Sequence, residues 1–166
     1  MEYIKICKRC KQSICCSIPF FAFVNAKEYI KIKEFLDKKK IQVNWSKIFK
    51  KEIEPPCYLI VKNKNGECIF LQKNKTCKIH EVKPLDCQLW PLTFEFVSET
   101  KIVNLYLGNC LIIKELDNLN KLINWIASQK EFLIRNIISF NEIELIAYSS
   151  LPDIPKLKKI GQFQIH

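Results

Sequence analysis

Nine cysteines are the residues of this 166-residue chain whose type and spacing could do chemistry. Cys7 and Cys10 form a Cys-x2-Cys pair, and the adjacent Cys15 and Cys16 follow within the same ten-residue stretch. A Cys-x2-Cys turn lets two thiolates face one cation while backbone N–H groups stabilise their charge. The same spacing also fits a thioredoxin-like redox motif, but the strand–helix–strand context of that motif is missing. The pattern therefore favours metal binding.

A second group of cysteines follows in the middle of the chain. Because adjacent side chains diverge in most backbone conformations, Cys15 and Cys16 are not expected to chelate one tetrahedral ion. We therefore expect two four-thiolate sites, each with ligands from both groups. All-thiolate ligation suits zinc and equally suits an iron–sulfur cluster, and the spacing does not separate them. The expected ligands are Cys7, Cys10, Cys15, Cys16, Cys68, Cys77, Cys87 and Cys110.

The second group also completes a recognisable pattern of short motifs. These are Cys68-Ile-Phe-Leu, Cys77-Lys-Ile-His, Lys83-Pro-Leu-Asp-Cys87-Gln-Leu-Trp-Pro and, more weakly, Gly108-Asn-Cys110. Together with the N-terminal cysteines they resemble the zinc- or iron-chelating domain family named for its CxxCxxCC-type motif, over about residues 7–110. The resemblance implies metal chelation by the cysteines and carries no established wider role.

The chain departs from the family pattern at several positions that are not cysteines. The gap before the Cys15-Cys16 pair is four residues, which is longer than usual in the family. His80 stands where tyrosine is usual, and Trp90 stands in place of phenylalanine. Lys83 and Gln88 replace two arginines, which puts in doubt any anion or partner contact made there by relatives.

Two further residues have metal-ligand chemistry but a simpler interpretation. Cys57 follows two prolines and precedes a predicted strand, so we interpret it as a small buried hydrophobe. His80 lies at Cys-x2-His spacing from Cys77, and we expect a structural role for it while a ligand role stays open. No Ser-His-Asp set or spaced carboxylate pair is evident, so the sequence shows no hydrolytic machinery and leaves an enzymatic role uncertain.

Composition excludes some classes of function and leaves others open. The chain has 3 glycines, none of them close together, which excludes a dinucleotide-binding glycine loop and a Walker-A loop. The net charge is +10, but 25 of the 27 basic residues are lysine, whereas sequence-specific nucleic-acid readers favour arginine. We interpret the charge as a solvated surface. An iron–sulfur enzyme or redox protein and a metal-stabilised nucleic-acid or protein interaction module remain alternatives.

The N-terminus has the outline of a signal peptide, with a basic segment, an apolar stretch over 14–24 and small residues after it. Against that interpretation, the stretch contains Ser17 and Pro19, and cleavage would discard four of the nine cysteines. No apolar run reaches the roughly 18 residues that a membrane span needs. We therefore expect a cytoplasmic protein with no membrane contact.

Short strands and helices must position these cysteines, so we expect an α+β fold. Residues 1–112 are expected to form a metal-stabilised core with β-hairpins, and 113–150 a helical extension packed on the same domain. Residues 151–166 are expected to form a loosely held tail. No internal repeat is detected in the sequence.

Local patterns predict the individual elements. Asn25 and Glu28 form a capping-box signature for a helix over about 26–40, and a short helix is expected at 45–49. The remaining elements are a hairpin pairing 58–61 with 68–71 through the turn 63–66, an irregular segment over 77–92, and a β pair of 93–97 with 102–107.

The C-terminal part has apolar residues at the spacing of a helix. Its predicted apolar stripe consists of Leu116, Leu119, Leu122, Ile123 and Ile126, continued by 132–138. Ser139 and Glu142 are expected to cap a last helix that extends through Ala147.

Overall fold

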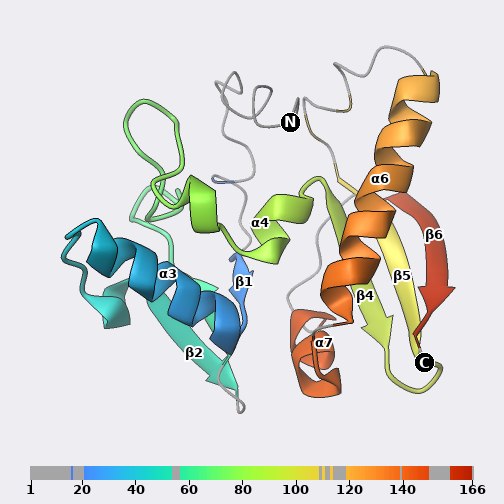
Figure 1. The fold of residues 1–166 in the computed structure, drawn as a ribbon, viewed down its shortest axis with the longest axis horizontal. Helices are drawn as coiled ribbons and strands as arrows, with labels where there is room; N and C mark the ends of the chain where they lie inside the picture. Colours follow the sequence, from blue (N-terminus) through green and yellow to red (C-terminus); the bar gives the residue numbers. More distant parts are fainter. Residues whose placement is uncertain are drawn as a thin grey trace. The chain divides into compact units, whose positions relative to one another are not determined.

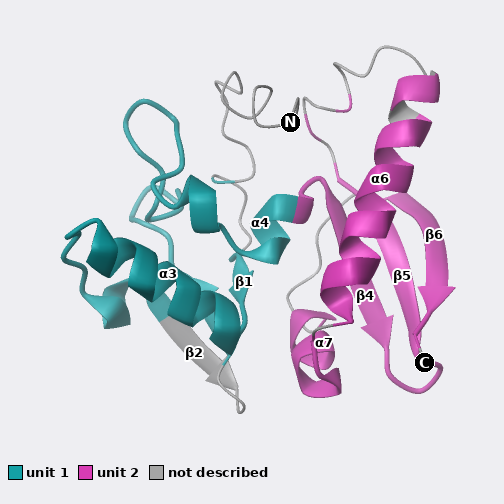
Figure 2. Ribbon diagram, in the orientation of Figure 1, with its two compact units in different colours: residues 1–88 teal, residues 89–166 magenta. Residues whose placement is uncertain are grey.

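The computed structural model describes residues 16, 21–53, 57–108, 110, 113, 119–138, 140–149 and 158–165 (Figure 1). The chain divides into two units, residues 1–88 and 89–166, each with helices and a three-stranded antiparallel sheet (Figure 2). The expected α+β class is therefore confirmed. The metal-stabilised core and the organisation with a boundary near residue 112 stay predictions.

The first unit contains helix α3 (Ala26–Lys38), which the capping signature predicted to within two residues. The Asn25 side chain accepts a hydrogen bond from the Glu28 N–H at 2.9 Å, and the Glu28 carboxylate accepts one from the Asn25 N–H at 3.1 Å. These two bonds satisfy N–H groups that a helix start leaves without partners. The helix buries Ile32 and Leu36 on one face.

The helix lies against a sheet of β1 (Phe23–Val24), β3 (Cys57–Ile60) and β2 (Phe49–Ile53), in the order β1-β3-β2 (Figure 1). The expected short helix at 45–49 is a 3-10 turn, η1 (Trp45–Lys47), and Phe49 already belongs to β2. The two layers share a core. Its buried members include Val24, Ile32, Leu36, Ile48, Phe49, Ile60, Phe70 and Ile79.

The predicted hairpin between 58–61 and 68–71 is wrong as a pair of strands, although the predicted turn at 63–66 is present, where the Gly66 N–H donates to the Asn63 carbonyl at 3.0 Å. Strand β3 pairs with β1 and β2 instead, and Cys68 makes one isolated bridge to Lys62. The Leu71 N–H bonds to the Cys68 carbonyl at 2.9 Å, so the chain turns immediately after the bridge and cannot extend a ladder.

The segment 77–92 is more regular than expected. It contains a 3-10 turn, η2 (His80–Val82), and helix α4 (Leu85–Leu89), and β4 begins at Leu92. Pro84 precedes α4, and its carbonyl accepts from the Gln88 N–H at 3.0 Å. Proline suits a helix start because its fixed φ is helical and its missing N–H would have no helical partner there. The prolines therefore delimit a helix here rather than prevent one.

The second unit has a sheet of β4 (Leu92–Val97), β5 (Ile102–Leu107) and β6 (Lys158–Gln164), in that order. The predicted β4–β5 pair is confirmed. The expected loose tail over 151–166 is corrected, because 158–164 form β6 along the second edge of β5. Such pairing depends on a strand far away in sequence and leaves little local signal.

Helices α6 (Leu119–Ile137) and α7 (Glu142–Ser149) complete the second unit. The apolar stripe is only partly right, because Ile123 is 52% exposed while Trp125 is buried. The cap of α7 is Asn141 rather than Ser139, which lies outside the described residues. Asn141 and Glu144 bond to each other reciprocally, both at 2.9 Å.

Helix α7 is fastened to β4 by polar and aromatic contacts. The Tyr148 hydroxyl lies 3.0 Å from the Thr93 hydroxyl, in a buried hydrogen bond. The Tyr148 ring stacks on Phe94 with a centroid separation of 4.0 Å. Helix α6 is drawn alongside the same sheet in Figure 1, and the Lys130 ammonium lies 6.0 Å from the Phe163 ring centroid in β6. Within the described residues, no helix has the length and apolarity needed to cross a membrane.

Replacement of Tyr148 by phenylalanine should lower the free energy of unfolding by about 1–2 kcal/mol, because it leaves the buried Thr93 hydroxyl without this partner. Tyr106→Phe is the matched control, since it removes an exposed bond to Glu95 of 2.8 Å and should change stability by less than about 0.5 kcal/mol. Urea unfolding followed by circular dichroism measures both. Equal effects of the two substitutions would contradict the assignment of the Tyr148 bond as stabilising.

Candidate metal centre

Residues 62–70 and 71–79 form two successive nine-residue loops, here named the first and second cysteine loops. In each loop the first residue pairs with the cysteine at the seventh position through an isolated antiparallel bridge. The expectation of no internal repeat is therefore corrected: the backbone repeats with a period of nine residues. The two bridges are Lys62 to Cys68 and Leu71 to Cys77.

The hydrogen bonds of the two loops repeat as well. In each, the second residue donates to the sixth carbonyl, at 2.8 Å in the first loop and 2.9 Å in the second. The fifth residue has a positive φ in both, 74° at Gly66 and 62° at Lys75. A left-handed residue is easy for glycine and less favourable for lysine, so the backbone path and not the residue type is what recurs. The two loops therefore deliver their cysteines in the same way.

Each loop is held in place by one apolar residue two positions after its cysteine. Phe70 is 3% exposed and Ile79 is 1% exposed, and both belong to the core of the first unit. Cys68 and Cys77 are half-buried and pack against the edge of this core. Cys68 and Cys77, two of the expected ligands, thus occupy equivalent positions in two loops that are anchored in the same core.

A backbone hydrogen bond joins the two cysteine groups of the sequence. The Cys68 N–H donates to the Cys16 carbonyl at 2.7 Å. Cys16 is half-buried, as is Cys68. Cys7, Cys10 and Cys15 lie outside the described residues. This contact brings one expected ligand of the N-terminal group beside one of the central group.

Cys87 is positioned by helix α4, which two carboxylates hold against the rest of the unit. Glu28 accepts from the Leu85 N–H at 2.6 Å, at the start of α4, while it also caps α3. Asp86 accepts from the Phe23 N–H in β1 at 2.9 Å. Because these residues flank Cys87 or bind its helix, they fix where its half-buried thiol lies.

The Glu28 carboxyl has a pKa raised above its ordinary value of 4.5. Burial is the main cause, because it disfavours the charged form, and the negative charge of Asp86 acts in the same direction. The hydrogen bonds from Leu85 and Asn25 and the charge of Lys31 oppose the shift without cancelling it.

Lys62 places a cation beside two of the expected ligands. Its Nζ is buried, and within the described part of the chain it has no hydrogen-bond partner. The pKa of Lys62 is lowered from its ordinary value, mainly by burial, and the charges of Cys68 and Cys16 oppose the shift without cancelling it. A buried ammonium near two thiols fits a group of thiolates, because each anion stabilises the cation.

The other candidate residues separate into distinct environments. Cys57 is 2% exposed in β3, which confirms its interpretation as a buried hydrophobe. His80 is half-buried, and its backbone N–H donates to the Cys77 carbonyl at 3.3 Å. Cys110 is half-buried and belongs to the second unit. Among the residues that the structure describes, no three His, Cys, Asp or Glu side chains are grouped as a metal site.

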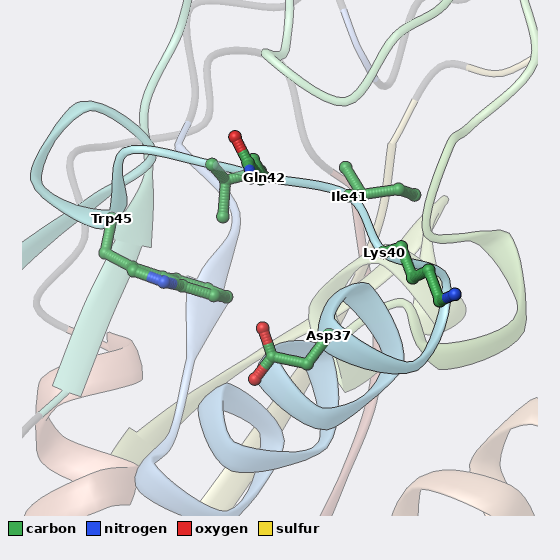
Figure 3. Close-up of a pocket in the computed structure, with 6 residues that line it drawn as sticks. Asp37, Lys40, Ile41, Gln42 and Trp45 are labelled. Atoms are coloured by element: carbon green, nitrogen blue, oxygen red, sulfur yellow. The ribbon is translucent and has the colours of Figure 1, made fainter.

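A surface hollow of about 540 Å³ lies at the C-terminal end of α3. In Figure 3 the Asp37 carboxylate is directed toward the space beside the Trp45 ring, whereas the Lys40 ammonium points away. None of the described residues that line it is a cysteine. Its lining residues are Asp37, Lys40, Ile41, Gln42, Val43 and Trp45.

Sequence reasoning found the cysteines but missed the residues that support them. The nine-residue separation of Cys68 and Cys77 was visible, as was an asparagine three residues before each cysteine, and together these signal a repeated loop. The capping role of Glu28 was predicted, but its bond to α4 was not. Nothing in the local sequence distinguishes Lys62 from the exposed lysines around it.

Glu28→Gln should change how stability depends on pH. The folded state holds the Glu28 proton more tightly than the unfolded state, so the wild-type protein should lose stability, relative to the variant, as pH rises above 4.5 and through the folded pKa. Chemical unfolding across this range measures the difference, with Glu34→Gln, an exposed carboxyl on the same helix, as the control for lost charge. A wild type that gains stability relative to the variant as pH rises would contradict the raised pKa of Glu28.

Comparison with known proteins supports metal binding in general. No curated protein and no protein of solved structure matches the chain significantly. One family does match, the CxxCxxCC family, described as "Putative zinc- or iron-chelating domain", and its match covers residues 6–117. This span contains all nine cysteines, namely the eight expected ligands and Cys57, and it includes both cysteine loops and α4. The chain therefore belongs to the CxxCxxCC family of zinc- or iron-chelating domains.

Proposed function

We propose that this protein binds zinc or iron through cysteine thiolates drawn from both cysteine groups. The observation that carries the proposal is the 2.7 Å hydrogen bond from the Cys68 N–H to the Cys16 carbonyl, which joins residues of the two groups. Family membership supports metal chelation in general. The ligand set proposed is Cys7, Cys10, Cys15, Cys16, Cys68, Cys77, Cys87 and Cys110.

The cysteines of the first unit are suited to this role because the protein positions them. Cys68 and Cys77 are carried by equivalent loops on one core, and Cys87 is carried by a helix that Glu28 and Asp86 anchor. A site built on supported elements loses little conformational entropy when the metal binds. Cys57 is excluded from the set because it is buried in a strand.

The eight thiols make two four-thiolate sites in this proposal. Cys15 and Cys16 are adjacent, and adjacent side chains diverge, so each of the two sites takes one of them. Zinc is the first candidate because closed four-cysteine sites commonly stabilise small domains, and an iron–sulfur cluster uses the same ligands. Either requires reduced cysteines, so we place the protein in the reducing cytoplasm.

Elemental analysis of the full chain, purified without oxygen, identifies the metal. Zinc in a colourless protein supports structural zinc sites. Stoichiometric iron and sulfide with broad visible absorption supports a cluster and would favour a redox or enzymatic role. Protein that binds neither metal after reconstitution with reduced thiols would overturn the proposal.

Single alanine substitutions of the proposed ligands test which cysteines bind. Cys68→Ala, Cys77→Ala and Cys87→Ala should each lower the amount of bound metal, because a closed site loses one of its thiolates. Cys57→Ala is the matched control and should leave bound metal unchanged, since this thiol is buried in β3. Metal content is measured on variants whose circular dichroism matches the wild type. Full metal content in all three ligand variants would exclude this ligand set.

A further inference from the structure

The two cysteine loops differ in chemistry at their first position. The first loop has Lys62 there and the second has Leu71, and both side chains are half-buried. Because the backbones match, the second loop shows that an apolar side chain fits this position. A lysine is the more costly choice, since burying an ammonium requires compensation by an anion or by hydrogen bonds.

The bridge determines which way the lysine faces. Residues directly opposite each other in an antiparallel pair project to the same side, with Cβ atoms about 4.5–5.5 Å apart. Lys62 and Cys68 are such a pair. Cys16 joins them through its carbonyl, which accepts the Cys68 N–H at 2.7 Å. The Lys62 side chain therefore lies along one cysteine and close to a second.

The Lys62 ammonium needs an acceptor that the described residues do not supply. Its Nζ is buried and makes no hydrogen bond to any of them. Thiolates that bind a divalent cation are strong acceptors, and four of them leave the centre with a net negative charge. Donors in the outer shell of a metal site orient the ligands and balance that charge.

We propose that Lys62 is a positioning residue of the metal centre, where its buried ammonium lies beside Cys68 and Cys16 and offsets the negative charge that their thiolates carry when metal is bound. This inference rests on the proposed function. It goes further by assigning a residue outside the ligand set that balances the negative charge of a centre rich in thiolate.

The test compares zinc affinity and metal-free stability in the same variants of the full chain. Lys62→Leu reproduces the residue of the second loop, so it should leave the stability of the metal-free protein unchanged or raise it. Its zinc affinity, measured by competition with a chromophoric chelator, should fall about 10–100-fold, as for other outer-shell partners. Lys62→Arg keeps a donor and a positive charge, and should restore most of the affinity.

Lys64→Leu is the matched control, because it removes the same charge from an exposed position in the same loop. Its zinc affinity should stay close to that of the wild type. Lys62→Met, an unbranched alternative, replaces the leucine variant if the latter does not fold. Cobalt substitution adds a spectroscopic readout, since the thiolate-to-metal charge-transfer band should shift in Lys62→Leu and not in Lys64→Leu.

The outcomes separate this inference from the proposed function. If the wild type binds neither zinc nor iron, the proposed function fails and this inference fails with it. If the wild type binds metal and Lys62→Leu binds it equally well, only the inference fails. Equal losses in Lys62→Leu and Lys64→Leu would show a general charge effect. Parallel losses of metal-free stability and affinity would show a merely structural lysine, and both results overturn the assignment to the metal centre.

Discussion

The burial of Phe70 and Ile79 in one core is the constraint on which the arrangement of the central cysteines depends. Each of these side chains follows its cysteine by two residues, and each is almost completely buried. A loop that is pinned so close to its thiol cannot move the thiol far without opening the core, because protein interiors are closely packed. The loops themselves carry exposed polar residues and would otherwise be free to vary.

Features that depend on neighbours in sequence could be predicted, and features that depend on distant partners could not. The Asn25–Glu28 capping box lies within four consecutive residues and was predicted correctly, as was the β4–β5 pair across its short turn. Strand β6 pairs with β5 from more than fifty residues away, and its residues alone resemble a tail. At the site, cysteine type and spacing identified the candidate ligands, but burial of Lys62 follows from the tertiary packing and has no local signature.

For the proposed cysteine centre, the position of one basic residue matters more than the net charge of the chain. The chain carries a net charge of +10, yet most of its lysines are surface residues whose interactions water and salt screen. Lys62 differs because its ammonium is removed from water beside two thiols, where an electrostatic interaction is screened much less. One buried lysine can therefore influence a cysteine centre more than the basic excess of the N-terminal third.

The support of the central cysteines also bears on what a metal would contribute to folding. In the first unit, the apolar anchors of the loops and the carboxylates that hold α4 are protein contacts that require no ion. The proposed ligands Cys7, Cys10 and Cys15 precede Cys16, whose carbonyl accepts from the Cys68 N–H, and a shared ion would join their thiols to this support. Metal binding would then add its free energy mainly where it joins the N-terminal segment to a core that is already built. On this view the core of the first unit already positions Cys68, Cys77 and Cys87, and the ion would join the N-terminal cysteines to it.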